Sequence, residues 1–391
     1  MFGLYESAFG SLTWGSVLML VLGCGLIYLG IARKIEPVLL VPIGAGIIMV
    51  NIPAAGLMIY APPVEPGAVP LPAIGGINEL VAGEIGVLNL LYQYGIRSTI
   101  IPLLIFLSLG SMTDFSPAIV RPIYLWFGAT AKLGVFVVFL IAYLTGWFDI
   151  GEALCVGIIG SSDGPPTVYL TVVQAPHLLG PITAIAYAYM ALVPIIQPPV
   201  IRLLVPKAQR AMYMKPQMRE VSRLEKIIFP VAVMLIAGVF VPASLPLVGM
   251  LMFGNLLAVT GVTDRLAASA AGVFADVLTF LLGLIVGALM PAVVFWNPQT
   301  LLIIGLAIVA FAFSTAGGIW GVQLANLFLK DKINPIIGAA GVSAVPMAAR
   351  VAQLEGQRAN PRNFLLMHAM GPCVSGVIST SVIAGIFVTI V

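Results

Sequence analysis

Long apolar runs separated by short polar or Pro/Gly-rich segments set the pattern of this chain. The runs cover residues 12–32, 38–60, 99–112, 123–145, 182–205, 227–241, 247–262, 276–294, 300–329 and 364–390. Most of them approach the roughly 20 apolar residues that an α-helix needs to cross a bilayer. The pattern predicts an all-α polytopic membrane protein. We expect the first run to be a retained span, because it is long enough to cross and ends in Arg33 and Lys34.

Three segments between the runs have other compositions. Residues 61–76 are rich in Pro and Gly, which predicts a loop. Residues 84–97 mix polar and apolar positions, which is typical of a helix lying in the membrane interface. Residues 206–226 carry six basic side chains against two acidic ones, so the positive-inside rule predicts a cytoplasmic loop.

Two further segments, 149–176 and 333–355, are apolar at both ends and broken in the middle. The first break reads GSSDGPP and the second contains GVSAVP. An offset of 181 residues places Gly160 on Gly341, and it also aligns the Ser and Pro positions of the two breaks. This match predicts two repeats, 1–205 and 227–391, joined by the basic loop 206–226.

Each half then contains five full crossings and one broken re-entrant hairpin. An odd number of crossings turns the second copy upside down, which gives the inverted repeat common in secondary transporters. The basic residues near the predicted cytoplasmic ends agree with this topology. We therefore expect the two hairpins to enter from opposite sides and their tips to meet near the midplane.

Composition narrows the function classes. Only 8% of the 391 residues are charged, 60% are hydrophobic and the mean hydropathy is +1.11. A water-facing surface needs about a quarter charged residues, so a soluble protein is excluded. A net charge of +3 and two His argue against nucleic-acid binding and zinc chemistry, and three Cys inside apolar runs argue against a disulfide framework.

Chemistry is expected at the two breaks. Irregular backbone at membrane depth is tolerated only where it is buried in protein or lines a polar cavity. Asp163 in the first break would cost about 2.5–3.5 kcal/mol if it stayed charged and unpaired at the bilayer centre. Its carboxylate, the hydroxyls of Ser161, Ser162 and Ser343, and freed carbonyls suit a small hard cation. The alternative is a Pro/Gly kink that holds a protonated, hydrogen-bonded Asp163.

Other polar residues in the apolar runs allow two interpretations each. Tyr187 and Tyr189 follow the first hairpin. One interpretation is that they supply an oxygen ligand or a proton there, and the other is that they only pack. His368, at the Tyr187 position of the repeat, is either structural or a proton carrier. Arg350, like Asn334 nearby, stands at the predicted cytoplasmic mouth, where a guanidinium fork holds an anion or merely snorkels. Lys132 either pairs with a carboxylate or snorkels, and the sequence assigns it no function.

Several motifs carry a family resemblance that runs nearly end to end. IIGSSDGP followed by the two tyrosines, NPIIGAAGVSAVPMAARV and NFLLMHAMGP resemble the beta subunit of the sodium-pumping, biotin-dependent decarboxylases. These enzymes act on oxaloacetate, glutaconyl-CoA, methylmalonyl-CoA or malonate. The resemblance implies a subunit that takes carboxybiotin from a carrier protein, releases CO2 with consumption of a proton, and exports Na+.

Site residues are implied by motif position. The resemblance implies catalytic roles for Asp163, Tyr189 and Arg350, and cofactor contacts for Arg350 and Asn334. The implied sodium ligands are Asp163, Ser162, Ser343, Asn334, Gly338 and Cys373. Two positions depart from the pattern: Pro166 stands where Thr is expected, and Cys373 stands where Asn is expected.

The leading hypothesis is therefore a translocase subunit in which decarboxylation drives Na+ export across the inner (plasma) membrane. Its cofactors would be Na+ and carboxybiotin presented by a separate carrier. The chain lacks a biotinyl-lysine context and a carboxyltransferase domain, so we expect a biotin carrier protein and a carboxyltransferase alpha subunit as partners. The other expected partners are a small membrane-anchoring subunit, membrane lipid and possible further beta subunits. The alternative is an inverted-repeat secondary transporter that couples Na+ to a carboxylate without chemistry. A purely structural membrane subunit would leave the broken hairpins unexplained.

Overall fold

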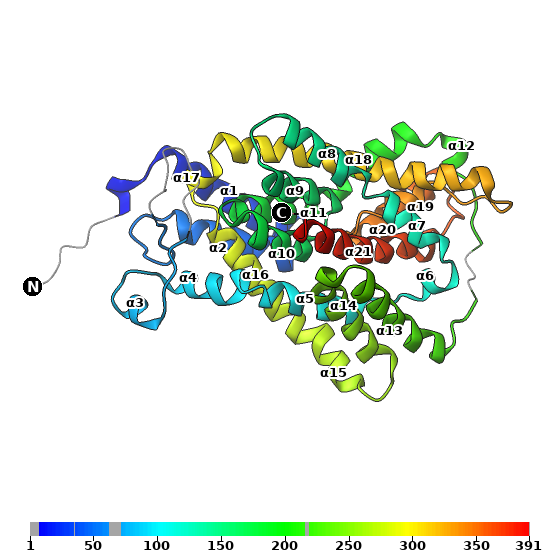
Figure 1. The fold of residues 1–391 in the computed structure, drawn as a ribbon. Coiled ribbons are helices and arrows are strands. Elements are labelled where there is room, and N and C mark those ends of the chain that lie inside the picture. Colours follow the sequence, from blue (N-terminus) through cyan, green and yellow to red (C-terminus); the bar gives the residue numbers. More distant parts are fainter. Residues whose placement is uncertain (1–7, 35, 62–71, 216–218, 391) are drawn as a thin grey trace, which may run out of the picture.

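The computed structural model describes residues 8–34, 36–61, 72–215 and 219–390, and within these ranges it is built from helices with no strand (Figure 1). Residues 62–71 of the predicted loop lie outside the described residues. An isolated bridge joins Tyr60 to Pro72 on either side of them. The all-α prediction is confirmed.

The first half of the chain forms helices α1 to α11. Their bounds are α1 Trp14–Ala32, α2 Pro37–Asn51, α3 Ile77–Val81, α4 Val87–Leu91, α5 Ile100–Met112, α6 Ser116–Val120, α7 Ile123–Thr130, α8 Leu133–Leu144, α9 Ile150–Ile158, α10 Gly164–Gln174 and α11 Leu179–Leu204.

The second half forms α12 to α21. Their bounds are α12 Lys207–Arg210, α13 Arg223–Phe240, α14 Leu245–Val259, α15 Asp264–Ser269, α16 Ala275–Ala288, α17 Ala292–Phe295, α18 Pro298–Phe328, α19 Ile336–Ala339, α20 Met347–Ala359 and α21 Leu366–Val388.

Among the described residues, six helical segments are long and apolar enough to cross a membrane, or eight if two bent helix pairs each count as one span. The protein is therefore a multi-pass membrane protein. Two predicted crossings fall outside that criterion: α2 has only 15 residues, and the first turn of α13 carries three charged residues. The predicted count of ten crossings stays a prediction.

Two predicted elements are bent. The segment 84–97, predicted as a separate interfacial helix, contains α4 and continues into α5 with a bend of 57°. The predicted span 182–205 is bent by 65° between Met190 and Leu192 within α11. Pro194 explains the second bend, because proline has no N–H and its ring collides with the carbonyl of the fourth residue before it, which is Met190.

Helix packing exchanges partners between the two halves. α2 packs on α16 and α14 packs on α5; likewise α10 packs on α21 and α20 packs on α11. If α2 is matched with α14, α5 with α16, α10 with α20 and α11 with α21, each contact has a counterpart. These pairings agree with the predicted repeat, while the inverted orientation and the repeat boundaries stay predictions.

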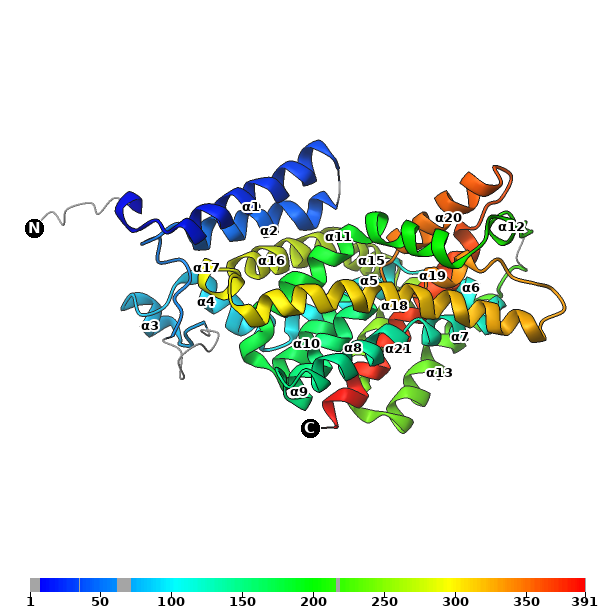
Figure 2. The same ribbon diagram turned by 90° about the horizontal axis from the view of Figure 1, so that it is seen from above.

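The long helix α18 supports both broken hairpins (Figure 2). A methyl group on Gly160 in the first break would press on Ala310, and one on Gly338 in the second hairpin would overlap the carbonyl of Gly318. These two positions on α18 are eight residues apart, which is about 12 Å along a helix. Glycine at both places therefore lets each hairpin approach the same helix backbone.

Candidate functional site

The first break places a buried carboxylate at the start of α10. The turn Ile159–Ser161 ends α9, Ser162 takes a left-handed conformation with φ of 53°, and Asp163 is the N-cap of α10. Only 4% of Asp163 is exposed. Its Oδ2 has no hydrogen-bond partner among the residues that the structure describes.

Two prolines explain why Asp163 does not cap its own helix. An N-cap carboxylate normally accepts from the backbone N–H of the second or third helical residue. Those positions are Pro165 and Pro166, which have no N–H. The carboxylate is therefore left free for a cation or a proton, and Pro166 removes a donor that Thr would supply.

Unpaired hydroxyls adjoin this carboxylate. Ser162 precedes it, and the ring of Tyr187 lies where a side chain on Gly164 would be. Tyr187 also interacts electrostatically with Asp163. The hydroxyl oxygens of Ser162 and Tyr187 are buried and lack hydrogen-bond partners in the described part of the chain. Buried polar atoms are costly unless they are satisfied, so this group of oxygens is suited to a bound cation or water.

The second break has different chemistry, because a lysine fills it. Lys132 lies between α7 and α8 and is fully buried. Its Nζ donates to Ser343 Oγ at 2.7 Å and to the Gly341 carbonyl at 3.3 Å. Ser343 Oγ lies 2.9 Å from Thr380 Oγ1 on α21. Lys132 also interacts electrostatically with Asp163, so its charge acts on both breaks.

Sequence reasoning named Lys132 without assigning it a role. The available signal was its place inside the apolar run 123–145, where a charged residue is costly and by default functional. What the sequence did not give was the direction of the side chain. The long side chain of a lysine in a span can snorkel to the interface, whereas Lys132 Nζ reaches Ser343 in the second break.

Two residues implied as sodium ligands have packing or structural contacts. The Asn334 amide donates to the carbonyls of Arg210 and Met212 at 3.0 and 2.9 Å and accepts from Ile336 N, so it fastens the basic loop to the second hairpin. Gly338 provides the close approach to α18.

The remaining implied residues are spread over two helices. Tyr189 donates to the Ile304 carbonyl at 2.8 Å on α18. Cys373 is a fully buried free thiol that interacts electrostatically with Lys132 and Asp163. Of the two tyrosines, Tyr189 bonds to α18, so Tyr187 is the one that interacts with the Asp163 carboxylate. His368 is held between Tyr124 Oη and the Lys215 carbonyl, each at 2.9 Å.

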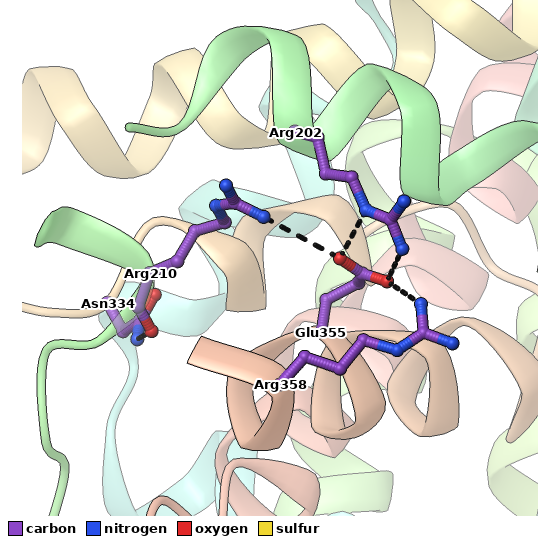
Figure 3. Close-up of polar contacts among 5 residues, drawn as sticks. All are labelled: Arg202, Arg210, Asn334, Glu355 and Arg358. Atoms are coloured by element: carbon purple, nitrogen blue, oxygen red, sulfur yellow. Dashed lines mark hydrogen bonds and ion pairs between the residues drawn. The ribbon is translucent and has the colours of Figure 1, made fainter. Parts of the chain in front are cut away.

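At the cytoplasmic mouth predicted by the sequence, the second hairpin carries a buried acid among arginines (Figure 3). Glu355 is 1% exposed and accepts from Arg202 at 2.9 and 2.8 Å in a two-bond fork. Arg358 also pairs with it, and Arg210 lies 3.8 Å away. The sequence pattern did not predict this cluster, which ties α11, α12 and α20 together. Its charge is positive, since three guanidiniums face one carboxylate.

Arg350 lies on the same helix as Glu355. It is exposed, and its side chain forms no hydrogen bond or ion pair with any described residue. A separate pocket of ≈300 Å³ is lined by Arg121, Tyr213, Met214, Lys215, Lys330, Asp331, Lys332 and His368. Both features leave cationic groups available to anions.

Comparisons with known proteins identify the family. A family model described as the Na+-transporting oxaloacetate decarboxylase beta subunit matches residues 15–391. The chain belongs to this family. It is 46% identical to the methylmalonyl-CoA decarboxylase subunit beta of Propionigenium modestum, over 99% of the chain and 97% of that protein.

Other relatives carry different acyl or keto-acid names. The chain is 44% identical to the glutaconyl-CoA decarboxylase subunit beta of Acidaminococcus fermentans, over 99% of the chain and 96% of that protein. It is 42% identical to the oxaloacetate decarboxylase beta chain of Haemophilus ducreyi, over 96% of the chain and 94% of that protein. The predicted family is confirmed. This chain is a membrane subunit of a Na+-transporting decarboxylase, as the leading hypothesis had it, and a plain secondary transporter is disfavoured.

Proposed function

We propose that this beta subunit decarboxylates carboxybiotin on its cytoplasmic side and couples the consumed proton to export of Na+ bound at Asp163. The observation that carries the proposal is the buried carboxylate whose Oδ2 lacks a partner among the described residues. In the reaction, the bond between the carboxyl carbon and the biotin ring nitrogen breaks, CO2 leaves, and a proton bonds to that nitrogen. A site that exchanges Na+ for H+ supplies this proton.

Coupling is required by the energy of transport. Moving one cation outward against about 150 mV costs roughly 3.5 kcal/mol before any concentration difference is counted. A carboxylate that binds either Na+ or H+, but not both, links the two fluxes. In each cycle Na+ leaves Asp163 to the outside and a proton replaces it, and the proton then passes to biotin as CO2 is released. Ser162 and Tyr187 supply further oxygens beside the carboxylate.

Arg350 is the residue we assign to the carboxylate of carboxybiotin. Its guanidinium is exposed and free of side-chain partners in the described ranges, and a planar fork suits a planar carboxylate. The Glu355 cluster holds the helix that carries Arg350, and Asn334 holds the neighbouring basic loop. Arg350→Lys should therefore impair decarboxylation much more than Na+ binding. Equal loss of both would indicate misfolding.

The family name implies a multi-subunit complex. Within it we assign presentation of carboxybiotin to a biotin carrier protein, its formation to a carboxyltransferase alpha subunit, and assembly to a small membrane-anchoring subunit. Association of several beta subunits is also part of the proposal. The acyl or keto-acid substrate is set by the carboxyltransferase rather than by this chain.

The decisive experiment is decarboxylation by the purified complex as a function of Na+, with and without avidin, which sequesters biotin. Na+-stimulated activity that avidin abolishes is the expected result. Avidin-insensitive uptake of Na+ with a carboxylate by this chain alone would instead establish the transporter.

The topology of the proposal is an inverted repeat of 1–205 and 227–391, joined by a cytoplasmic loop 206–226, with hairpins 149–176 and 333–355. What supports it is the exchange of helix partners between the halves. Single cysteines at Glu152 and Gln357 in a cysteine-free chain should label from opposite sides of the membrane. Labelling from one side would exclude the inversion.

A further inference from the structure

Lys132 is the most unusual group of the interior. It is one of the largest fully buried side chains. It bonds to the second break and interacts electrostatically with Asp163 of the first break, where the proposed function places Na+. A lysine ammonium has three N–H donors and no acceptor. The ammonium donates to two oxygens of the second break, the Ser343 hydroxyl and the Gly341 carbonyl.

These acceptors are the kind that a hard cation uses. Hard cations are held by hydroxyl, carbonyl and carboxylate oxygens, and breaks in membrane helices provide such oxygens. Ser343 Oγ is also in contact with Thr380 Oγ1. The second break therefore presents a cluster of oxygens of the type suited to Na+, and the ammonium of Lys132 already lies against it.

The surroundings of Lys132 are unfavourable for a second cation. Cys373, also buried, interacts electrostatically with Lys132, and a thiol is a soft ligand that suits Na+ poorly. A Na+ ion placed at Ser343 would meet the positive charge of Lys132 at short range, where the interior screens little. The ammonium also interacts electrostatically with Asp163. It forms no hydrogen bond with that carboxylate among the described residues, and Asp163 Oδ2 has no hydrogen-bond partner there.

We propose that the Lys132 ammonium is a tethered cation that occupies the oxygen site of the second break, so that this chain binds Na+ at Asp163 and not at Ser343. The proposal rests on the proposed function, since it assigns which of the two breaks carries the transported ion. It follows that the positive charge at the second break stays with the protein throughout the cycle.

The test counts bound ions rather than activity. Equilibrium binding of ²²Na+ is measured on the complex purified with its own subunits, per beta subunit, for the native chain and Lys132→Gln. Glutamine removes the charge and offers an amide oxygen. We expect Lys132→Gln to bind about one additional Na+ at saturation, because the vacated oxygens match hard-cation chemistry. Lys132→Arg, which keeps the charge, should bind no additional ion.

Ser343→Ala provides the second arm and does not depend on how Lys132 variants fold. In the native chain it should leave Na+ stoichiometry and affinity unchanged, whereas in the Lys132→Gln chain it should remove the additional ion. A loss of Na+ binding on Ser343→Ala in the native chain would overturn the proposal, since Ser343 would then be a ligand. A Lys132→Gln chain that binds the same number of ions more tightly would also overturn it, because Lys132 would then only compete for Asp163.

Asp163→Asn separates this inference from the proposed function. If it removes the native Na+ while Lys132→Gln adds none, the inference about Lys132 fails and the function stands. If Asp163→Asn leaves Na+ binding intact, the proposed ion site itself is wrong.

Discussion

The two breaks, at residues 160–166 and 341–346, share a sequence plan but differ in electrostatics. The first holds a carboxylate, Asp163, with an oxygen that no described residue satisfies. The second holds a hydroxyl, Ser343, that already accepts from a buried lysine. Each is a helix interruption packed on α18. The two breaks therefore open the backbone in a similar way, while single side chains decide whether the oxygens there already have a hydrogen-bond donor.

The reason for the difference lies partly in the prolines. In the first break, Pro165 and Pro166 deny Asp163 the backbone donors of its own helix. In the second break, Ser343 Oγ accepts a hydrogen bond from Lys132, which lies between α7 and α8 and outside the hairpin. A carboxylate oxygen without a hydrogen-bond donor is suited to exchange Na+ and H+. A hydroxyl that already accepts from a lysine is suited to a structural role.

The largest effect is expected from removing the charge of the first break. Asp163→Asn keeps the shape and hydrogen-bonding capacity of the side chain but should abolish Na+-coupled decarboxylation. In the native chain, raising the pH should lower the Na+ concentration needed for half-maximal activity, because fewer protons compete for the carboxylate. The measurement is decarboxylation rate against Na+ at several pH values. Full Na+-stimulated activity in Asp163→Asn would reduce the first break to a structural kink.

Weakening the cluster that holds the second hairpin should have the next largest effect. Glu355→Gln leaves three arginines around a neutral amide and should destabilise the folded chain by about 1–3 kcal/mol, less than a fully buried pair because Arg202 and Arg358 are largely exposed. The melting temperature of the purified complex and its decarboxylation rate should both fall. Na+ binding at Asp163 should persist in the folded fraction. Arg358→Gln, which leaves the Arg202 fork in place, is the milder control.

A smaller change should follow from giving the first break a donor. Pro166→Ala restores a backbone N–H at the third position of α10, so that it donates to the Asp163 carboxylate in competition with Na+. The Na+ concentration for half-saturation should rise by about two- to thirtyfold, since an N-cap bond is worth about 0.5–2 kcal/mol. Titration with ²²Na+ measures it. Val172→Ala, farther along the same helix, should not shift the titration.

The smallest effect is expected at an exposed acid outside both breaks. Arg219, which bonds to Glu225, lowers the pKa of that carboxyl to about 2, with help from Ser222. A depressed folded-state pKa stabilises the chain above the unfolded value of 4.5, and this contribution is lost as the pH falls from there toward about 2. Glu225→Gln removes this titration. The melting temperature should therefore fall slightly less between pH 4.5 and about 2 than it does in the native chain. A large shift would show that the basic loop contributes more to stability than an exposed ion pair does.

Much of the architecture was readable from local patterns. Apolar runs, the basic loop and the two Gly/Pro interruptions predict the helices and the broken hairpins, because hydrocarbon admits only chains that satisfy their own backbone groups. Asp163 could be singled out for the same reason, as the acid within a break. Neither bend was predicted. Pro194 is a local signal for the bend in α11, but the joining of α4 to α5 depends on how neighbouring helices pack.

The sequence by itself determined that a membrane chain carries an acid in one interruption and a matching serine in the other. Only the tertiary structure decided that Lys132 reaches Ser343, that Tyr187 rather than Tyr189 adjoins the carboxylate, and that Glu355 gathers three arginines. The physical reason is that a helix period fixes which face a residue lies on, but not which helix covers that face. Lys132 and Ser343 are 211 positions apart, and nothing local to either residue encodes the bond between them.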